Sequence, residues 1–195
     1  MKTSFDEIRK IAFRALDSAG APAGIDDDGG WACAWLEAAG YPGLQMLAQF
    51  FDDDGGPDAF GGVESIAGGE IAAGGRSAIT LAALIVEYAS MRTEPVTVRQ
   101  LAHAPFLIAH AARLAEHGTN LIVDPVREAI CDVTIRHAGD GYAKQRTRTH
   151  EAISEGLDVD KDAFERVYAY SRRILVPQSE TSLLSGAGAG LTDND

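Results

Sequence analysis

Apolar side chains recur at helical spacing through the first fifty residues, and this periodicity constrains the fold more than any other feature of the chain. Ser4 followed by Glu7 forms a capping box, which predicts where a first helix begins, and Gly20 predicts where it ends. The apolar face of this helix consists of Phe5, Ile8, Ala12, Ala15, Leu16 and Ala19.

Two further helices are predicted before residue 52. The acidic run Asp26–Asp28 supplies N-cap candidates for the second helix, and Gly40 ends it. Pro42 suits the first turn of the third helix. Residues 1–51 are therefore expected to form a helical N-terminal part of three short helices. The apolar faces of the last two are Trp31, Trp35 and Ala38, and then Leu44, Leu47, Ala48 and Phe51.

Periodicity disappears between residues 52 and 77, where four glycine pairs interrupt the chain. Loops longer than about 15 residues without structure of their own are usually functional or disordered. We therefore expect a glycine-rich loop over 52–77, with no more than one short strand at 63–66. Two roles stay open for it, a lid or partner-binding segment and a merely mobile connection.

Strands and helices alternate after this loop. A helix is predicted over 78–91, although its β-branched residues leave a strand as the alternative. A strand follows at 95–101, a helix begins at Pro105 and is closed by Gly118, and a short strand covers 120–123. This order predicts a compact βαβ unit with two parallel strands and a right-handed crossover.

The third quarter of the chain predicts a hairpin. Residues 127–137 alternate between apolar and polar, and a glycine-rich turn separates them from a second strand at 142–149. A helix over 161–173 and a short strand at 174–176 follow, before a tail that Pro177 opens.

We therefore expect an α+β fold in a single domain, residues 1–195. The helical part, 1–51, packs with a mixed sheet that contains the βαβ unit and the C-terminal hairpin. The glycine-rich loop 52–77 leads into the α+β core, 78–176, and residues 177–195 form a C-terminal tail.

Charge and composition exclude several classes of partner. Seventeen basic residues against 29 acidic ones give a net charge of -12, which repels nucleic acids and anionic membrane surfaces. No apolar run approaches the roughly 18 residues that span a membrane. The two cysteines, Cys33 and Cys131, and the absence of an apolar signal sequence point to the reducing cytoplasm.

The tail repeats glycine at Gly186, Gly188 and Gly190 and ends in acidic residues that include Asp193. A dinucleotide fingerprint would need a strand before these glycines and a helix after them, and only five residues follow, so that interpretation is rejected. Three interpretations stay open: a nest of backbone N–H groups for an anion, oxygen ligands for a metal, and simple disorder.

A basic strand carries the main ligand-binding prediction. Lys144, Arg146 and Arg148 alternate and therefore share one face of the predicted hairpin, which Arg136 can join from the other strand. Arginine binds a carboxylate or phosphate through two parallel hydrogen bonds. The alternative is a solvated face that pairs with acids from elsewhere. His137 and His150 flank the hairpin and are the candidate acid–base residues.

Arg76 is a further anion-site candidate, because it follows two glycines at the start of a predicted helix. His103, His110 and His117 recur every seven residues, and two histidines at that spacing lie about 10 Å apart along a helix, too far to share a metal. These histidines therefore predict no metal site, and the sequence leaves any cofactor unknown.

Three segments together resemble a known family: Ser4–Ile8, residues 20–43, which hold a Trp-Leu-Glu and a Gly-Tyr-Pro-Gly sequence, and the closing 186–195. This family is bacterial, common in proteobacteria, and catalogued only as a domain of unknown function. The resemblance extends over the whole chain and implies a bacterial cytoplasmic protein of about this length, with no assigned reaction.

Two hypotheses about function follow. In the first, the protein is an enzyme or enzyme subunit that handles a small anionic, carboxylate-bearing metabolite, held by the arginines and closed in by the glycine-rich loop or the tail. In the second, it is a non-catalytic module that binds a partner or forms a homo-oligomer through the tail.

Overall fold

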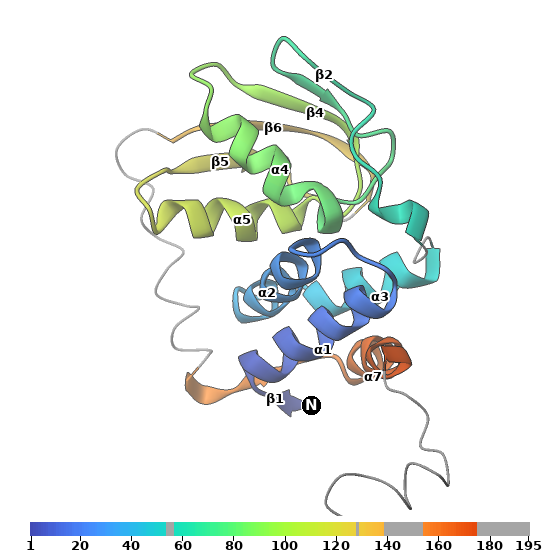
Figure 1. The fold of residues 1–195 in the computed structure, drawn as a ribbon. Coiled ribbons are helices and arrows are strands. Elements are labelled where there is room, and N and C mark those ends of the chain that lie inside the picture. The colour runs from blue at the N-terminus through green and yellow to red at the C-terminus, as the bar shows by residue number, and fades with distance from the viewer. Residues whose placement is uncertain (54–56, 128, 139–153, 175–195) are drawn as a thin grey trace, which may run out of the picture.

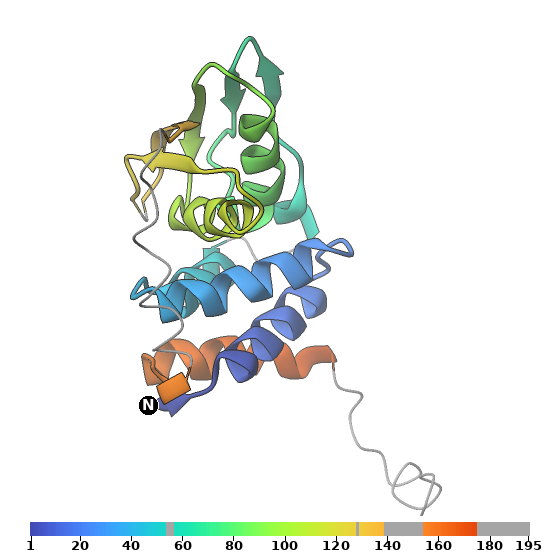
Figure 2. The same ribbon diagram turned by 90° about the vertical axis from the view of Figure 1, so that its left-hand side faces the viewer.

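The protein is built of stacked layers, with a five-stranded sheet at one end and a group of helices at the other (Figures 1 and 2). The computed structural model describes residues 1–53, 57–127, 129–138 and 154–174. Two helices, α4 and α5, lie against one face of the sheet and separate it from the helical part that contains the N-terminus. Buried apolar side chains of all these layers form one cluster.

Helix α1 (Phe5–Ser18) begins at the predicted capping residue. The Ser4 hydroxyl accepts a hydrogen bond from the Glu7 amide, 3.1 Å away. The Glu7 carboxylate accepts from the Thr3 hydroxyl at 2.7 Å rather than completing the reciprocal half of the capping box. Gly20, with φ of 91°, follows the end of the helix as predicted.

Helix α2 (Ile25–Ala38) begins before its aspartates instead of after them. Its N-cap is Gly24, whose φ of 97° suits glycine, so the predicted N-cap role of Asp26–Asp28 is wrong. The Asp26 carboxylate instead accepts hydrogen bonds from the Gly24 and Asp27 amides at 2.8 and 2.9 Å. The three acids occupy the first turn, where the helix dipole favours negative charge.

Helix α2 is the central element of the structure, because it contacts α1, α3, α4 and α5. Two glycines bring α1 close to it. A Cβ on Gly30 would lie 2.9 Å from the Arg9 carbonyl oxygen and from the Phe13 amide nitrogen, and one on Gly29 would lie 2.6 Å from a methyl of Leu16. The contact between α1 and α2 is thus one of backbone against backbone.

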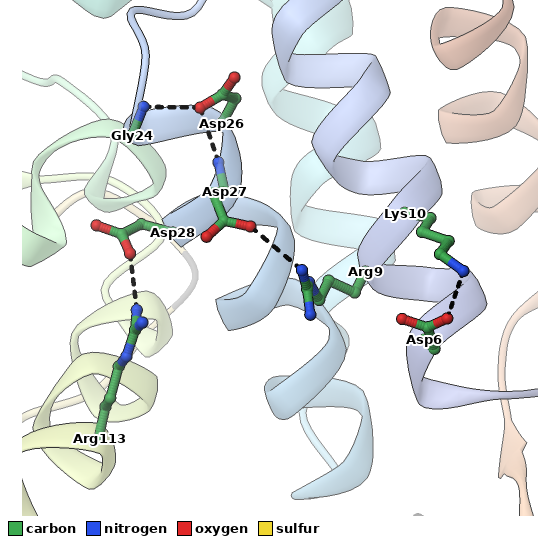
Figure 3. Close-up of polar contacts among 8 residues, drawn as sticks. All are labelled: Asp6, Arg9, Lys10, Gly24, Asp26, Asp27, Asp28 and Arg113. Atoms are coloured by element: carbon green, nitrogen blue, oxygen red, sulfur yellow. Dashed lines mark hydrogen bonds and ion pairs between the residues drawn. The ribbon is translucent and has the colours of Figure 1, made fainter.

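Charged side chains at the start of α2 link it to its neighbours on both sides (Figure 3). Asp27 pairs with Arg9 of α1 at 3.6 Å, and Asp28 pairs with Arg113 of α5 at 2.7 Å. The Arg113 guanidinium also lies 5.0 Å from the centre of the Trp31 ring. Exposed pairs of this kind contribute little singly, so they orient the helices more than they stabilise them.

His110 of α5 (Pro105–Ala115) lies in the same interface, as a buried residue in edge contact with Trp31. Burial lowers the pKa of His110 to about 4; the Asp28 carboxylate raises it and the Arg113 guanidinium lowers it further. The imidazole is therefore neutral at pH 7, and His110 belongs to the core.

Helices α3 (Gly43–Asp53) and α7 (Lys161–Ser171) complete the helical part and were both predicted. The Glu37 carboxylate accepts a hydrogen bond from the Leu44 amide at 2.7 Å and so caps α3. The Tyr170 ring stacks on Phe51 at 4.5 Å and joins α7 to α3. Asp160 is the N-cap of α7.

Short elements flank this helical part. Strand β1 (Lys2–Thr3) pairs antiparallel with β7 (Leu157–Asp158) beside α1. The 3-10 helix η2 (Arg172–Ile174) follows α7 and takes the place of the start of the strand predicted at 174–176. Residues 175 and 176 lie outside the described part of the chain.

The segment predicted as a glycine-rich loop contains three elements. A 3-10 helix, η1 (Pro57–Phe60), precedes β2 (Ser65–Ala67) and β3 (Glu70–Ala72), which form a hairpin around Gly68 and Gly69. The loop prediction over 52–77 is thus wrong for much of its length. Strands of three residues are too short to show an alternating pattern, and the positive φ of both glycines serves the turn.

The sheet has the strand order β2-β3-β4-β6-β5. Helix α4 (Ala78–Ser90) was predicted as a helix, and it connects β3 to its parallel neighbour β4 (Val96–Leu101). The βαβ unit with adjacent strands is therefore β3-α4-β4, which begins one strand earlier in the chain than predicted.

The predicted unit, β4-α5-β5, is split by a later strand. Strand β6 (Cys131–His137) lies between β4 and β5 (Leu121–Asp124) and is antiparallel to both, so β4 and β5 run in the same direction without touching as neighbours. The described neighbours of β6 are these two strands and not a following hairpin strand. The predicted hairpin partner, 142–149, lies outside the described residues.

The two faces of the sheet differ in polarity. Val98, Val133 and Ile135 are fully or almost fully buried beneath α4 and α5, whereas Arg99 on the opposite face bridges Glu70 and Asp132 at 3.2 and 2.8 Å. No helix in the described ranges is both long and apolar enough to cross a membrane.

We predict that Gly30→Ala lowers the free energy of unfolding by about 2 kcal/mol, because the added methyl meets the α1 backbone and overpacking of this kind typically costs 1–3 kcal/mol. Chemical denaturation followed by circular dichroism measures it. Gly62→Ala is the matched control, since a Cβ there meets nothing within 4 Å. Equal stability of the two variants would contradict the close contact between α1 and α2.

We also predict that stability falls between about pH 6.5 and pH 4 because of His110. The pKa of His110 in the folded protein lies below the ordinary value of 6.5, so as the pH falls the unfolded chain is protonated before the folded protein. Acidification therefore stabilises the unfolded chain relative to the folded protein. This loss amounts to at most about 3 kcal/mol and should be absent from His110→Gln. Denaturation curves at pH 7 and 4.5 compare the two proteins, and parallel losses would refute the assignment.

Candidate functional site

A cleft lies beside the C-terminal ends of the parallel strands β3 and β4, the edge at which open α/β sheets usually bind ligands. Residues 73–77 connect β3 to α4, and residues 102–104 connect β4 to α5. The end of α3 and the helix η1 form the opposite wall. The cleft has a volume of about 440 Å³, within the range of small-molecule sites. Its lining residues are Gln49, Phe50, Asp53, Asp58, Ala59, Glu64, Gly74, Gly75, Arg76, Ser77, Ala102, His103, Ala129 and Ile130.

The two connecting loops are held together by their backbones. The Gly75 amide donates to the Gln100 carbonyl at 2.7 Å, and the Ala102 amide donates to the Arg76 carbonyl at 3.0 Å. Gln100 and His103 both have φ of 54°, a left-handed conformation that is uncommon for residues other than glycine. Such conformations cluster at ligand sites, where the surrounding structure enforces them.

Ser77 and His103 meet at the junction of these loops. The Ser77 Oγ lies 2.9 Å from His103 Nδ1 and also accepts a hydrogen bond from the Ile79 amide, which makes Ser77 the N-cap of α4. Both residues are less than a tenth exposed. Burial lowers the pKa of His103, and the Asp53 carboxylate raises it in opposition, so a neutral imidazole suits this position.

Arg76 supplies the positive charge of the cleft. Its Nη1 donates to the Asp58 carbonyl at 3.2 Å, and its guanidinium lies against Gly61, where a Cβ would come within 2.5 Å of Nη1. The side chain is half-buried and immediately precedes the first turn of α4. The sequence predicted this placement of a guanidinium at a helix N-terminus.

Three carboxylates line the same cleft. Asp53 ends α3, Asp58 lies in η1, and Glu64 precedes β2 with its side chain across Gly74. None of these three residues is buried, so solvent screens them in the open cleft. Phe50 and Ile130 add apolar surface to the lining.

The other predicted site residues in the described part of the chain lie elsewhere. Arg136 is exposed on β6 opposite Ile122, and His137 Nε2 lies 2.8 Å from the Arg92 carbonyl. Both belong to the end of β6 remote from the cleft, since Ile130 lines the cleft and the seven residues of the strand extend about 20 Å. The structure therefore does not bring Arg76 together with Arg136 and His137.

The remaining predicted positions fall outside the described residues. These include the basic strand with its flanking histidine and the glycines and acid of the tail. They are Lys144, Arg146, Arg148, His150, Gly186, Gly188, Gly190 and Asp193.

Among the described residues, neither cysteine forms a metal site with other side chains. Cys33 is fully buried, and burial raises the pKa of its thiol well above the ordinary value, while Cys131 is half-buried in β6. Both are free thiols. Across residues 1–53, 57–127, 129–138 and 154–174, no group of three or more His, Cys, Asp or Glu side chains is arranged to hold a metal ion.

Sequence reasoning missed most of this cleft. His103 was considered only through its spacing from His110, and Ser77 only as the start of a helix. Two features of the sequence could have indicated the cleft. Two glycines, an arginine and Ser77 come directly before a helix, and a second helix begins 28 residues after Ser77, at Pro105. Two such connections in neighbouring parallel strands place their helix N-termini side by side.

Comparison with known proteins identifies one related family. Residues 3–93 match the family described as "Protein of unknown function (DUF3726)". The matched region runs from β1 to just after α4 and includes Arg76 and Ser77, but not His103 or the tail. This supports the resemblance to a family of unknown function for the N-terminal part of the chain. No curated protein and no solved structure matches the chain.

Proposed function

We propose that the protein binds a small carboxylate-bearing metabolite in the cleft between the β3-α4 and β4-α5 loops. The observation that supports this most strongly is the position of Arg76, a half-buried residue directly before the N-cap of α4 that lines the cleft. The guanidinium can bind an anionic group directly, and the dipole of α4 favours negative charge near this end of the helix, whose first amides already donate to Ser77 and Ala102.

The polar interactions expected at Arg76 alone correspond to a dissociation constant of about a millimolar or weaker. A hydrogen bond to a charged group contributes about 1.5–3 kcal/mol, and a helix N-terminus adds about 0.3–1 kcal/mol. Phe50 and Ile130 provide apolar contact for the remainder of a small ligand. Ser77 and His103 fix the two loops to each other, so the wall exists before the ligand arrives.

We predict that at least one compound from a panel of small carboxylic and amino acids raises the melting temperature of the full chain, and that Arg76→Gln weakens its binding by about ten- to a hundred-fold. Differential scanning fluorimetry identifies the ligand, and titration calorimetry measures the affinities. Arg14→Gln is the matched control, because Arg14 is exposed on α1. A panel without any stabilising acid, or a ligand indifferent to Arg76→Gln, would overturn the proposal.

An enzymatic role is the second candidate, and the hydrogen bond between Ser77 and His103 favours it. A hydroxyl within hydrogen-bond reach of a neutral imidazole is the pair required for a serine nucleophile. In the described structure no carboxylate is hydrogen-bonded to His103 to orient it, and both side chains are buried. Binding therefore remains the primary proposal.

Reaction with a fluorophosphonate tests the enzymatic candidate. If Ser77 is an activated nucleophile, the probe should modify it in the folded protein, with a rate at least ten-fold lower in His103→Gln, where the proton acceptor is lost. Peptide mapping by mass spectrometry locates the adduct. Exposed Ser65 serves as the internal reference, and Ser77 modification no faster than that of Ser65 would rule this candidate out.

A further inference from the structure

The cleft is lined by charged side chains of both signs, and these side chains do not pair with one another. Arg76, Asp53, Asp58 and Glu64 all line it, yet among the described residues none of the four forms an ion pair within 4.0 Å. Elsewhere in the described structure eight such pairs do form. Because the guanidinium and the carboxylates of this cleft form no ion pairs with one another, they are available to bind a ligand.

These side chains come from different elements around the cleft. The Arg76 guanidinium is fixed between the Asp58 carbonyl and the backbone of Gly61. Glu64 lies across Gly74, at the end of the β3 strand, and a Cβ there would collide with its carboxylate. Asp53 approaches from the end of α3 and lies near enough to His103 to raise its pKa.

The balance of these charges argues against a ligand that is only anionic. Three carboxylates against one guanidinium make the cleft net negative, since burial keeps His103 neutral. A simple carboxylate gains at Arg76 but is repelled by the three acids that line the same cleft. A compound that also carries a positive group turns those acids into partners.

We infer that the ligand is a small zwitterion with a carboxylate and a protonated amine, the chemical class of amino acids and their close derivatives. Arg76 receives the carboxylate beside the first turn of α4, and Glu64 and Asp53 receive the ammonium group. This inference rests on the proposed binding function and narrows its ligand class.

Matched sets of three compounds test this inference on the full chain at pH 7. Leucine, 3-methylbutylamine and 4-methylpentanoate form one set, and phenylalanine, phenethylamine and 3-phenylpropanoate form a second. Within each set the apolar group is constant while the charged groups are removed one at a time. Titration calorimetry should show the amino acid of at least one set binding three- to ten-fold tighter than its acid and its amine, a modest factor because the acids are solvent-exposed.

Near-isosteric variants assign each charge. Glu64→Gln and Asp53→Asn should remove the preference for the amino acid over the acid, and Arg76→Gln should remove the preference over the amine. Glu116→Gln, on the exposed end of α5, should leave both preferences unchanged. Melting temperatures close to that of the parent chain establish that the variants are folded.

The outcomes separate the two proposals. If the acid binds as tightly as the amino acid, or if Glu64→Gln and Asp53→Asn change nothing, the zwitterion inference fails while the carboxylate-binding proposal stands. If the amine alone binds as tightly as the amino acid and Arg76→Gln has no effect, both fail. If no compound of either set binds, the zwitterion inference fails, and the wider acid panel decides the binding proposal.

Discussion

The close contact of α1 with the two glycines of α2 sets the geometry on which the rest of the structure depends. Because the backbone of α1 packs directly against the backbone of α2, the other sides of α2 are available for contacts with α3, α4 and α5. The position of α3 then fixes Phe50 and Asp53, and the position of α4 fixes Arg76 and Ser77. The two walls of the cleft are thus placed by one buried helix that does not itself line it.

The elements that sequence predicted correctly are those whose signals are local. Ser4, Pro105 and Asp160 mark helix starts through side-chain or ring chemistry within one turn, and the helices begin where these residues indicate. The predictions of strand pairing were wrong where the paired strands are far apart in the sequence. Nothing near β6 in the sequence shows that it inserts between β4 and β5, and β3 is too short to reveal that it has neighbours on both sides.

The cleft was predictable only in the case of Arg76, because the two glycines before it and the helix start after it are its neighbours in the sequence. Ser77 and His103 are 26 residues apart and meet only when β3 and β4 lie side by side. The contribution of Asp53 depends on how α3 packs against α2 and α7, and no spacing in the sequence expresses it. The predicted cluster around Arg136 stays a prediction, because its other cations lie outside the described residues; β6 places Arg136 itself on the sheet face opposite α4 and α5.

Both tryptophans of the chain, Trp31 and Trp35, lie on α2, with ring centres 6.4 Å apart. The first contacts Arg113 and His110 of α5, and the second is almost fully buried. The intrinsic ultraviolet emission of the protein therefore comes from the junction between its layers and not from the cleft. The wavelength of the emission maximum reports whether the helical part and the sheet remain packed together. It is therefore an optical probe of that junction that needs no added label.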